Sequence, residues 1–239
     1  MSLPTTFPEE RPRLPLNLIL MGPPGAGKGT QASRLAQRLR VPAISTGDML
    51  REESTRGSAL GREAKTYMNR GALVPDTLMI AIIEARLQRE DCTHGFILDG
   101  FPRTVTQAEA LDRALHRCGG ALHRVGSLTV SRDEVVRRLT GRRTCRDCST
   151  PYHLAFDPPV QHDTCDICGG VLLRRDDDHE AVIAARLEVY ARDTAPLLDY
   201  YRDRGLLTEI DGHGKHDDVL AALLTHLDVG GSERSASPA

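Results

Sequence analysis

The chain has 239 residues, 40% of them hydrophobic and 27% charged, with a formal net charge of −2 at pH 7. This length and balance predict one large α/β domain and exclude a fibre or a fully disordered chain. The near-neutral charge gives no general attraction to nucleic acid or to an anionic membrane, so any polyanion chemistry must rest on local clusters of arginine.

The two ends differ from the middle of the chain. Residues 1–15 contain four prolines and residues 228–239 are small and polar, so both are predicted to be disordered tails. The sequence has no apolar run of about 18 residues and no signal-peptide pattern. These features predict a soluble, cytoplasmic protein.

The first predicted element is a strand at residues 16–21, which runs into the glycine-rich loop Gly22–Thr30 (GPPGAGKGT) and then a helical segment, residues 31–40. Such a loop turns backbone N–H groups around a phosphate, and the helix dipole and Lys28 add positive charge. Lys28 is conspicuous because only three of the 31 basic residues are lysines. The generic pattern places Ser or Thr, the usual Mg²⁺ hydroxyl ligand, directly after the lysine, but here Gly29 takes that place and Thr30 follows it.

Strand-like and helix-like segments then alternate along the chain, which predicts a parallel sheet flanked by helices. Thr46 or Asp48, Asp76, Thr104 and Ser131 are expected at N-caps or in first turns. The predicted strands are residues 95–102, 124–130 and 206–212, and the predicted helices are residues 46–55, 77–88, 104–117, 131–139, 179–204 and 216–227.

Four cysteines have the spacing of a zinc ribbon: Cys145, Cys148, Cys165 and Cys168 form two CxxC pairs separated by sixteen residues. Four thiolates around one metal leave no position open for water, so the metal is predicted to be structural. The alternatives are two disulfides, unrelated surface thiols, or His153 or His162 as competing ligands, and the spacing alone does not exclude iron. Cys92 and Cys118 lack the spacing and are expected to be ordinary buried or half-buried thiols.

Arginines flank the cysteine segment instead of lying within it. The residues between the CxxC pairs include no lysine or arginine, which makes them a poor surface for tracking phosphates. A stiff flap between two arginine clusters suits closure over a triphosphate, although a solvated helix face is the alternative for any single residue. The clusters are Arg137, Arg138, Arg142 and Arg143 before the segment, and Arg174 and Arg175 after it.

Taken together, these motifs resemble those of the adenylate kinases, in the long bacterial form with a four-cysteine zinc lid. The resemblance covers about residues 16–225 and implies the P-loop nucleoside monophosphate kinase fold, an α/β fold with a parallel sheet core. It implies a core at residues 16–227 that contains an AMP-binding insert (45–74) and a zinc-binding lid (141–178). The motifs that carry it are GPPGAGKGT, STGDMLR (45–51), GALVPD (71–76), GFILDGFPRT (95–104) with Gln107, GRR (141–143) and RRDDDHEAVIAARL (174–187).

The resemblance also implies roles for individual residues. ATP would be bound by Gly25, Ala26, Gly27, Lys28, Gly29, Thr30, Arg138, Arg142, Pro151, Tyr152 and Gly214. AMP would be bound by Thr46, Arg51, Ala72, Leu73, Val74, Gly100, Phe101, Pro102, Arg103, Gln107, Arg175 and Arg186. The catalytic set would be Lys28, Arg103, Arg138, Arg142, Arg175 and Arg186. Asp99 would orient a water-held Mg²⁺. For two residues a simpler role is the alternative: Gln107 as a helix-surface amide and Thr46 as an N-cap only.

The implied reaction is reversible phosphoryl transfer, ATP + AMP = 2 ADP, by a monomer that uses Mg²⁺ with ATP and a structural Zn²⁺, without nucleic-acid or membrane partners. Charge stabilisation by arginine suits such a transfer, which needs no general base. One alternative is a related kinase with another acceptor or with GTP as donor. A second is a non-catalytic P-loop and zinc-ribbon protein that binds nucleic acid.

Overall fold

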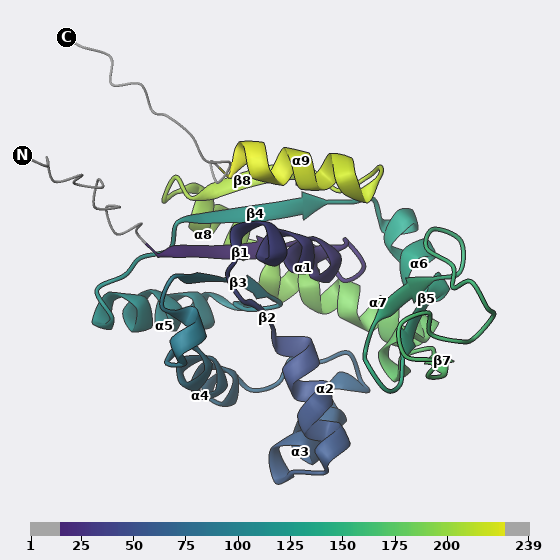
Figure 1. Cartoon of the computed structure of the whole chain (residues 1–239). Helices are drawn as coiled ribbons and strands as arrows, with labels where there is room; N and C mark the ends of the chain where they lie inside the picture. Colours follow the sequence, from purple (N-terminus) through teal and green to yellow (C-terminus); the bar gives the residue numbers. More distant parts are fainter. Residues whose placement is uncertain (1–14, 228–239) are drawn as a thin grey trace, which may run out of the picture.

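The computed structural model describes residues 15–227, and Figure 1 shows a central sheet with helices on both faces. Five parallel strands have the order β2-β3-β1-β4-β8. Their bounds are β1 Leu16–Met21, β2 Ala43–Ser45, β3 Gly95–Asp99, β4 Arg124–Thr129 and β8 Leu207–Asp211. The predicted parallel sheet is confirmed; β2 was not predicted, because three residues are too short to show an alternating pattern.

Nine α-helices are described in this part of the chain. They are α1 Lys28–Leu39, α2 Thr46–Arg56, α3 Ala59–Met68, α4 Asp76–Leu87, α5 Val105–Arg117, α6 Arg132–Gly141, α7 Glu180–Val189, α8 Pro196–Arg202 and α9 His216–His226. Thr104 and Ser131 are N-caps as expected, with their hydroxyls accepting from the N–H groups of Gln107 and Glu134. Ser45 caps α2, so Thr46 is a first-turn residue and not the cap.

The single helix predicted over residues 179–204 is wrong, because it divides into α7 and α8. A π-helical turn, Tyr190–Thr194, lies between them, and the Ala195 N–H donates to the Tyr190 carbonyl. Pro196 has no N–H group to continue an α-helical ladder, and it stands at the start of α8. Helix α3 was not predicted separately; Gly57, with a φ of 69°, ends α2, and the Ser58 side chain caps α3.

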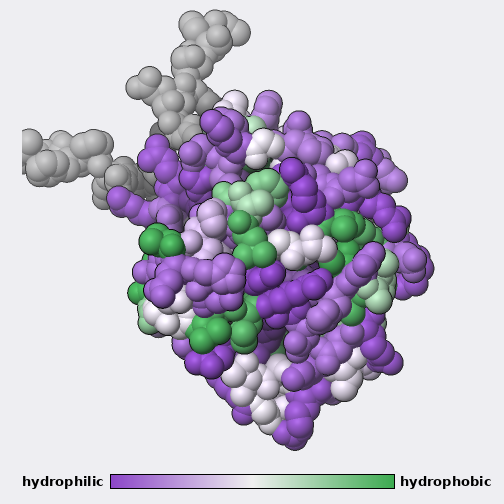
Figure 2. All heavy atoms as spheres, turned by 90° about the vertical axis from the view of Figure 1, so that its right-hand side faces the viewer, coloured by the Kyte–Doolittle hydropathy of each residue, from purple (hydrophilic) through white to green (hydrophobic). Residues whose placement is uncertain are grey.

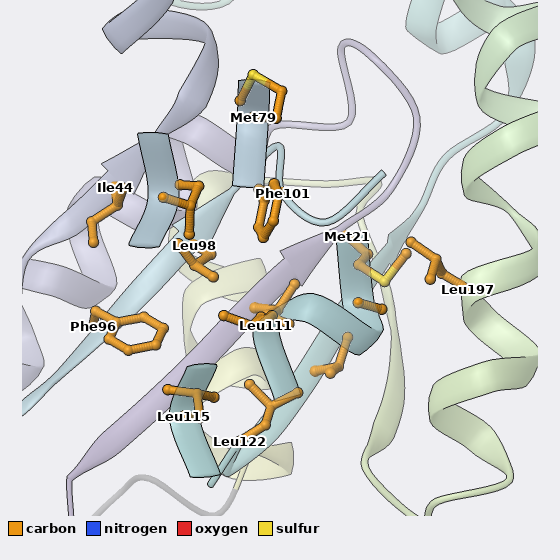
Figure 3. Close-up of a cluster of buried hydrophobic side chains, with 14 of the residues drawn as sticks. Met21, Ile44, Met79, Phe96, Leu98, Phe101, Leu111, Leu115, Leu122 and Leu197 are labelled. Atoms are coloured by element: carbon orange, nitrogen blue, oxygen red, sulfur yellow. The ribbon is translucent and has the colours of Figure 1, made fainter. Parts of the chain in front are cut away.

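Alternating side chains of β1 build the two layers of the core. Leu18 and Leu20 pack on the face covered by α1 and α9, whereas Ile19 and Met21 pack on the face covered by α4, α5 and α8. Figure 3 shows members of the second cluster, among them Met21 and Leu111, gathered beside the sheet. The tight packing fixes the carboxyl ends of the strands, where the loops after β1, β3 and β4 meet.

Two small units project from this core (Figure 1). One is the α2–α3 pair, and the other is an antiparallel sheet of β6 (Pro151–His153), β5 (Arg142–Cys145) and β7 (Leu172–Leu173) that follows α6. Figure 2 faces the side that carries the second unit; it is mostly hydrophilic, with separate apolar patches. Residues 141–178, which include this small sheet, are called the lid below.

The structure also bears on the expectations for the chain ends, for the two other cysteines and for membrane-spanning segments. The predicted disordered tails lie outside the described residues, apart from Pro15. Cys92 is buried as expected, but the expectation for Cys118 is wrong: its thiol is exposed at the C-terminal end of α5, where the helix opens to solvent. Among residues 15–227, none of the helices combines the length and apolar character needed to span a bilayer.

Candidate active site

The phosphate loop connects β1 to α1 at the carboxyl edge of the sheet. Gly22, Gly25 and Gly27 have φ angles of 138°, 83° and 95°, a region that other residues rarely adopt. The Lys28 ammonium bends back to donate to the carbonyls of Gly22 and Pro23, at 2.8 and 2.9 Å. Burial lowers the pKa of Lys28 to about 8, while the neighbouring Asp99 carboxylate opposes that shift. The loop therefore holds one buried cation at the amino end of a helix.

The carboxylate of Asp99 explains why a glycine follows Lys28. A Cβ atom on Gly29 would lie 3.3 Å from Asp99 Oδ2, so a larger side chain would crowd the carboxylate. Asp99 ends β3, next to the loop, and burial raises its pKa while Lys28 lowers it. The residue that departs from the generic P-loop pattern thus lies against an acidic side chain. Carboxylate oxygens of this kind are suitable partners for Mg²⁺ or its bound water.

Arg138 of α6 spans the phosphate loop and the loop after β8. Its guanidinium donates to the carbonyls of Ala26 and Gly212, at 3.3 and 2.9 Å. Nε of the same guanidinium donates to Glu134, one helical turn earlier, at 2.7 Å. Gly214, the predicted adenine contact, lies in the same loop with a φ of 99°. Arg138 therefore links the phosphate loop to the loop that contains Gly214.

A cavity that opens to solvent lies between the α2–α3 pair and the sheet. Thr46 is fully buried at its edge and donates its hydroxyl to the Gly100 carbonyl at 2.9 Å, so it does more than begin a helix. Arg51 forms an ion pair with Asp48 beside it. The lining includes Thr46, Arg51, Ala72, Leu73, Val74, Gly100, Arg103, Gln107 and Arg186, all of them predicted acceptor-site residues.

Gln107 is not a surface amide, because only 1% of it is exposed. Its Oε1 accepts from the Arg103 N–H at 2.8 Å, and its Nε2 donates to Asp76 Oδ1 at 2.7 Å. The other oxygen of Asp76 accepts from the Thr104 hydroxyl at 2.8 Å. The amide is therefore held at both ends in the wall of the cavity.

A second cavity extends from the first to the phosphate loop. Lys28 and Pro102 line this second cavity, whereas Arg103 and Arg186 line both. Burial lowers the pKa of Arg103 to about 10, and it also lowers the pKa of Arg186. Two cavities that share partly buried cations can hold two anionic ligands with their charged ends together. Phe101, by contrast, packs into the core.

Two aspartates that the sequence analysis did not assign hold the arginines at the base of the lid. Asp178 is fully buried and accepts from Nε of Arg142 at 2.7 Å, and its neighbour Asp177 pairs with Arg186 at 2.9 Å. Arg175 donates to the Thr144 hydroxyl, and burial lowers its pKa to about 10. Both aspartates lie in the motif RRDDDHE, directly after two arginines. This run of acidic residues beside arginines was the one sequence feature that could have indicated ion pairs at the lid base.

The four cysteine thiols converge in the lid, with all sulfur atoms within 4.8 Å of one another. The Cys145–Cys168 and Cys148–Cys165 pairs are each 3.5 Å apart, and none of these cysteines is in a disulfide. Tetrahedral zinc at about 2.3 Å from each thiolate places neighbouring sulfurs about 3.8 Å apart, so the site fits that metal. The spacing-based grouping is confirmed.

The other predicted lid residues have defined places. Tyr152 is buried with the cysteines, and its hydroxyl accepts from the Asp166 N–H at 2.8 Å. Its neighbour Pro151 begins β6 and is exposed. His153 Nδ1 accepts from two backbone N–H groups, and His162 pairs with Asp163, so neither imidazole takes part in the cysteine cluster.

Comparison with known proteins agrees with this geometry. The family model described as adenylate kinase matches residues 20–206. The chain belongs to the adenylate kinase family. Members catalyse the reversible reaction ATP + AMP = 2 ADP, so the chain is a nucleoside monophosphate kinase, and a non-catalytic nucleic-acid-binding protein is no longer an alternative.

Individual adenylate kinases are similar over most of their length. That of Methanocella arvoryzae is 53% identical over 206 residues, which cover 86% of this chain and 95% of the relative. That of Archaeoglobus fulgidus is 53% identical over 197 residues, 82% of this chain and 91% of the relative. That of Syntrophobacter fumaroxidans is 51% identical over 208 residues, which cover 87% of this chain and 98% of the relative.

Proposed function

We propose that this adenylate kinase carries out phosphoryl transfer at the junction of the two cavities. The supporting observation is that Arg103 and Arg186 line both cavities, with Lys28 in one and Gln107 in the other. A donor triphosphate at the phosphate loop and an acceptor monophosphate beside Gln107 would meet at these cations. The family reaction then needs only that the two phosphates be aligned.

For the donor, we propose a site made of the phosphate loop, the lid and the loop after β8. Backbone N–H groups of the loop and the Lys28 ammonium would hold the phosphates, and Arg138 and Arg142 would approach from the lid base. The full donor set is Gly25, Ala26, Gly27, Lys28, Gly29, Thr30, Arg138, Arg142, Pro151, Tyr152 and Gly214.

For the acceptor, we propose the cavity beneath α2. Arg51 and Arg175 would bind the monophosphate, while backbone groups of residues 72–74 and the Gln107 amide would contact the base. The full acceptor set is Thr46, Arg51, Ala72, Leu73, Val74, Gly100, Phe101, Pro102, Arg103, Gln107, Arg175 and Arg186. The AMP-binding insert would be residues 45–74, and the zinc-binding lid would be residues 141–178.

The chemistry follows from charge and position. Phosphoryl transfer has a loose transition state with charge spread over its oxygens, so no general base is required. Lys28 and the arginines at positions 103, 138, 142, 175 and 186 would stabilise that charge, because guanidinium forks bind phosphate oxygens in pairs. Mg²⁺ bound with ATP would neutralise donor phosphates, with Asp99 orienting its water. The lid cysteines would hold a structural Zn²⁺, and the enzyme would act as a cytoplasmic monomer without nucleic-acid or membrane partners.

A coupled assay of ADP formation tests the proposal. Purified enzyme is given ATP and Mg²⁺ with AMP, GMP, CMP or UMP, and then GTP in place of ATP with AMP. We expect ATP with AMP to have the highest kcat/KM. Preference for another acceptor or for GTP would assign the chain a different substrate pair within the same architecture.

A further inference from the structure

Gln107 has hydrogen-bond partners that allow only one orientation of its side-chain amide. Arg103 offers a backbone N–H, which can only donate, and it lies 2.8 Å from Oε1. Asp76 offers a carboxylate, whose oxygens accept, and Oδ1 lies 2.7 Å from Nε2. A flipped amide would set its oxygen against the carboxylate and its NH₂ against the N–H group. The orientation therefore follows from the chemistry of the partners.

Asp76 is itself fixed in place. Its second carboxylate oxygen accepts from the Thr104 hydroxyl at 2.8 Å, and the same hydroxyl accepts the Gln107 N–H as the cap of α5. Asp76 also begins α4, two residues after Val74, whose segment lines the acceptor cavity. The carboxylate thus connects the segment on one side of the cavity to the amide on the other.

The fixed amide has one N–H and one oxygen lone pair left for a ligand. A 6-aminopurine presents an N–H donor at position 6 next to a ring-nitrogen acceptor, which matches an amide oxygen and an amide N–H. A 6-oxopurine presents an acceptor at position 6, which would face the amide oxygen. Leaving buried polar groups unmatched or opposed in this way is costly, so amide orientation alone discriminates between the two bases.

We propose that Asp76 is a specificity-determining positioning residue: by holding the Gln107 amide in one orientation, it makes the acceptor site select 6-aminopurine over 6-oxopurine monophosphates. This inference rests on the proposed acceptor site and adds a residue that does not itself touch the substrate. Loss of Asp76 removes one of the two restraints on the amide. The flipped orientation is then opposed by the Arg103 N–H but not by a carboxylate, so a 6-oxopurine can select it at a lower cost.

The test compares AMP with inosine 5′-monophosphate, which differs at the 6-position and its adjacent ring nitrogen. The kcat/KM of each is measured with ATP for wild type, Asp76→Ala and the isosteric Asp76→Asn. We expect the AMP to inosine-monophosphate ratio to fall at least about tenfold in Asp76→Ala and about threefold in Asp76→Asn, with KM for ATP unchanged. Asp112→Ala is the matched control, because it removes a carboxylate on α5 that accepts from Tyr200, and its ratio should stay at the wild-type value.

A ratio that is unchanged in both Asp76 variants overturns the inference, even if both acceptors are used less well, since a purely structural role would reduce them equally. If Asp76→Ala does not fold, as judged by circular dichroism, the Asp76→Asn ratio decides. Failure of the wild-type enzyme to phosphorylate AMP would instead contradict the proposed function, so the two failures are distinguishable.

Discussion

Arg142 and Asp178 form a two-point ion pair across the base of the lid, with Arg142 Nε 2.7 Å from one carboxylate oxygen and Nη2 in contact with the other. The pair joins β5 to the short turn before α7. Asp178 is fully buried and also lies 3.5 Å from Arg186. One buried carboxylate therefore pairs with Arg142 and lies near Arg186, two of the arginines proposed to bind phosphates.

Asp178→Asn should lower the free energy of unfolding by about 3 kcal/mol, because the partly buried Arg142 guanidinium loses its counter-charge, whereas Arg186 keeps its nearer partner Asp177. Guanidinium chloride denaturation of the nucleotide-free protein measures the change. Asp217→Ala is the control, since Asp217 pairs with Arg34 but is 81% exposed, and its effect should stay within about 0.5 kcal/mol. An Asp178→Asn effect as small as the control's would show that the pair contributes little to stability.

Arg186→Ala should reduce kcat by at least about 100-fold while the protein stays folded, because Arg186 is a cation at the junction of the two cavities. Steady-state kinetics measures kcat, and circular dichroism shows whether the variant is folded. Arg202→Ala removes an arginine that is half exposed and pairs with Asp199 and Glu209 away from the cavities, so its kcat should be unaffected. Near-normal turnover of Arg186→Ala would remove this residue from the catalytic set.

The lowered pKa of Lys28 predicts that use of the donor declines in alkaline solution. Its pKa in the folded protein is about 8, against an ordinary value of 10.5, so between these values the free enzyme has lost a proton that the unfolded chain keeps. In that window the unfolded state binds more protons, and the stability of the ligand-free enzyme rises with pH. The kcat/KM for ATP should nevertheless fall above about pH 8, because neutral Lys28 attracts phosphate less.

Two measurements check this prediction. Calorimetry of ATP binding at pH 8 to 9, in two buffers of different ionisation enthalpy, should show proton uptake. In Lys28→Arg the alkaline fall should move to higher pH, because arginine stays charged. A kcat/KM that is flat up to pH 9.5 in the wild type would contradict the assignment.

The cysteine cluster should hold about one equivalent of zinc per chain in protein purified without chelator. Removing the metal should lower the thermal midpoint much more than it lowers activity at low temperature, because a closed four-thiolate site contributes folding free energy and no chemistry. Cys165→Ser should lose the metal, and Cys118→Ser, an exposed thiol outside the cluster, should keep it. Equal loss of activity and stability at every temperature would indicate a catalytic metal.

Local sequence patterns predicted much of this site. The strand, glycine loop and helix around Lys28 lie within 24 residues, and the CxxC pairs define the cysteine cluster by spacing alone. Such features depend on short-range geometry, which the sequence carries directly. The resemblance to adenylate kinases supplied Gln107 and Arg186, and the structure places both in the cavity lining.

Contacts between distant segments could not be predicted in this way. Asp178 meets Arg142 across 36 residues, and Asp76 meets Gln107 across 31, because the lid and α5 fold back to bring them together. Either aspartate, considered alone, is an ordinary acidic residue near the start of a helix. The role of each aspartate follows from the charged and hydrogen-bonding groups that the fold places around it.

The two cavities are proposed to hold the two nucleotides of one reaction. A structure of the enzyme with a bisubstrate mimic, two adenosines joined by a chain of phosphates, tests this directly. We predict one mimic per chain, with one adenosine in the cavity beside Gln107 and the phosphates passing Arg103 and Arg186 to reach Lys28. A mimic bound with neither adenosine in that cavity, or with its phosphates away from these three cations, would contradict the two-nucleotide site.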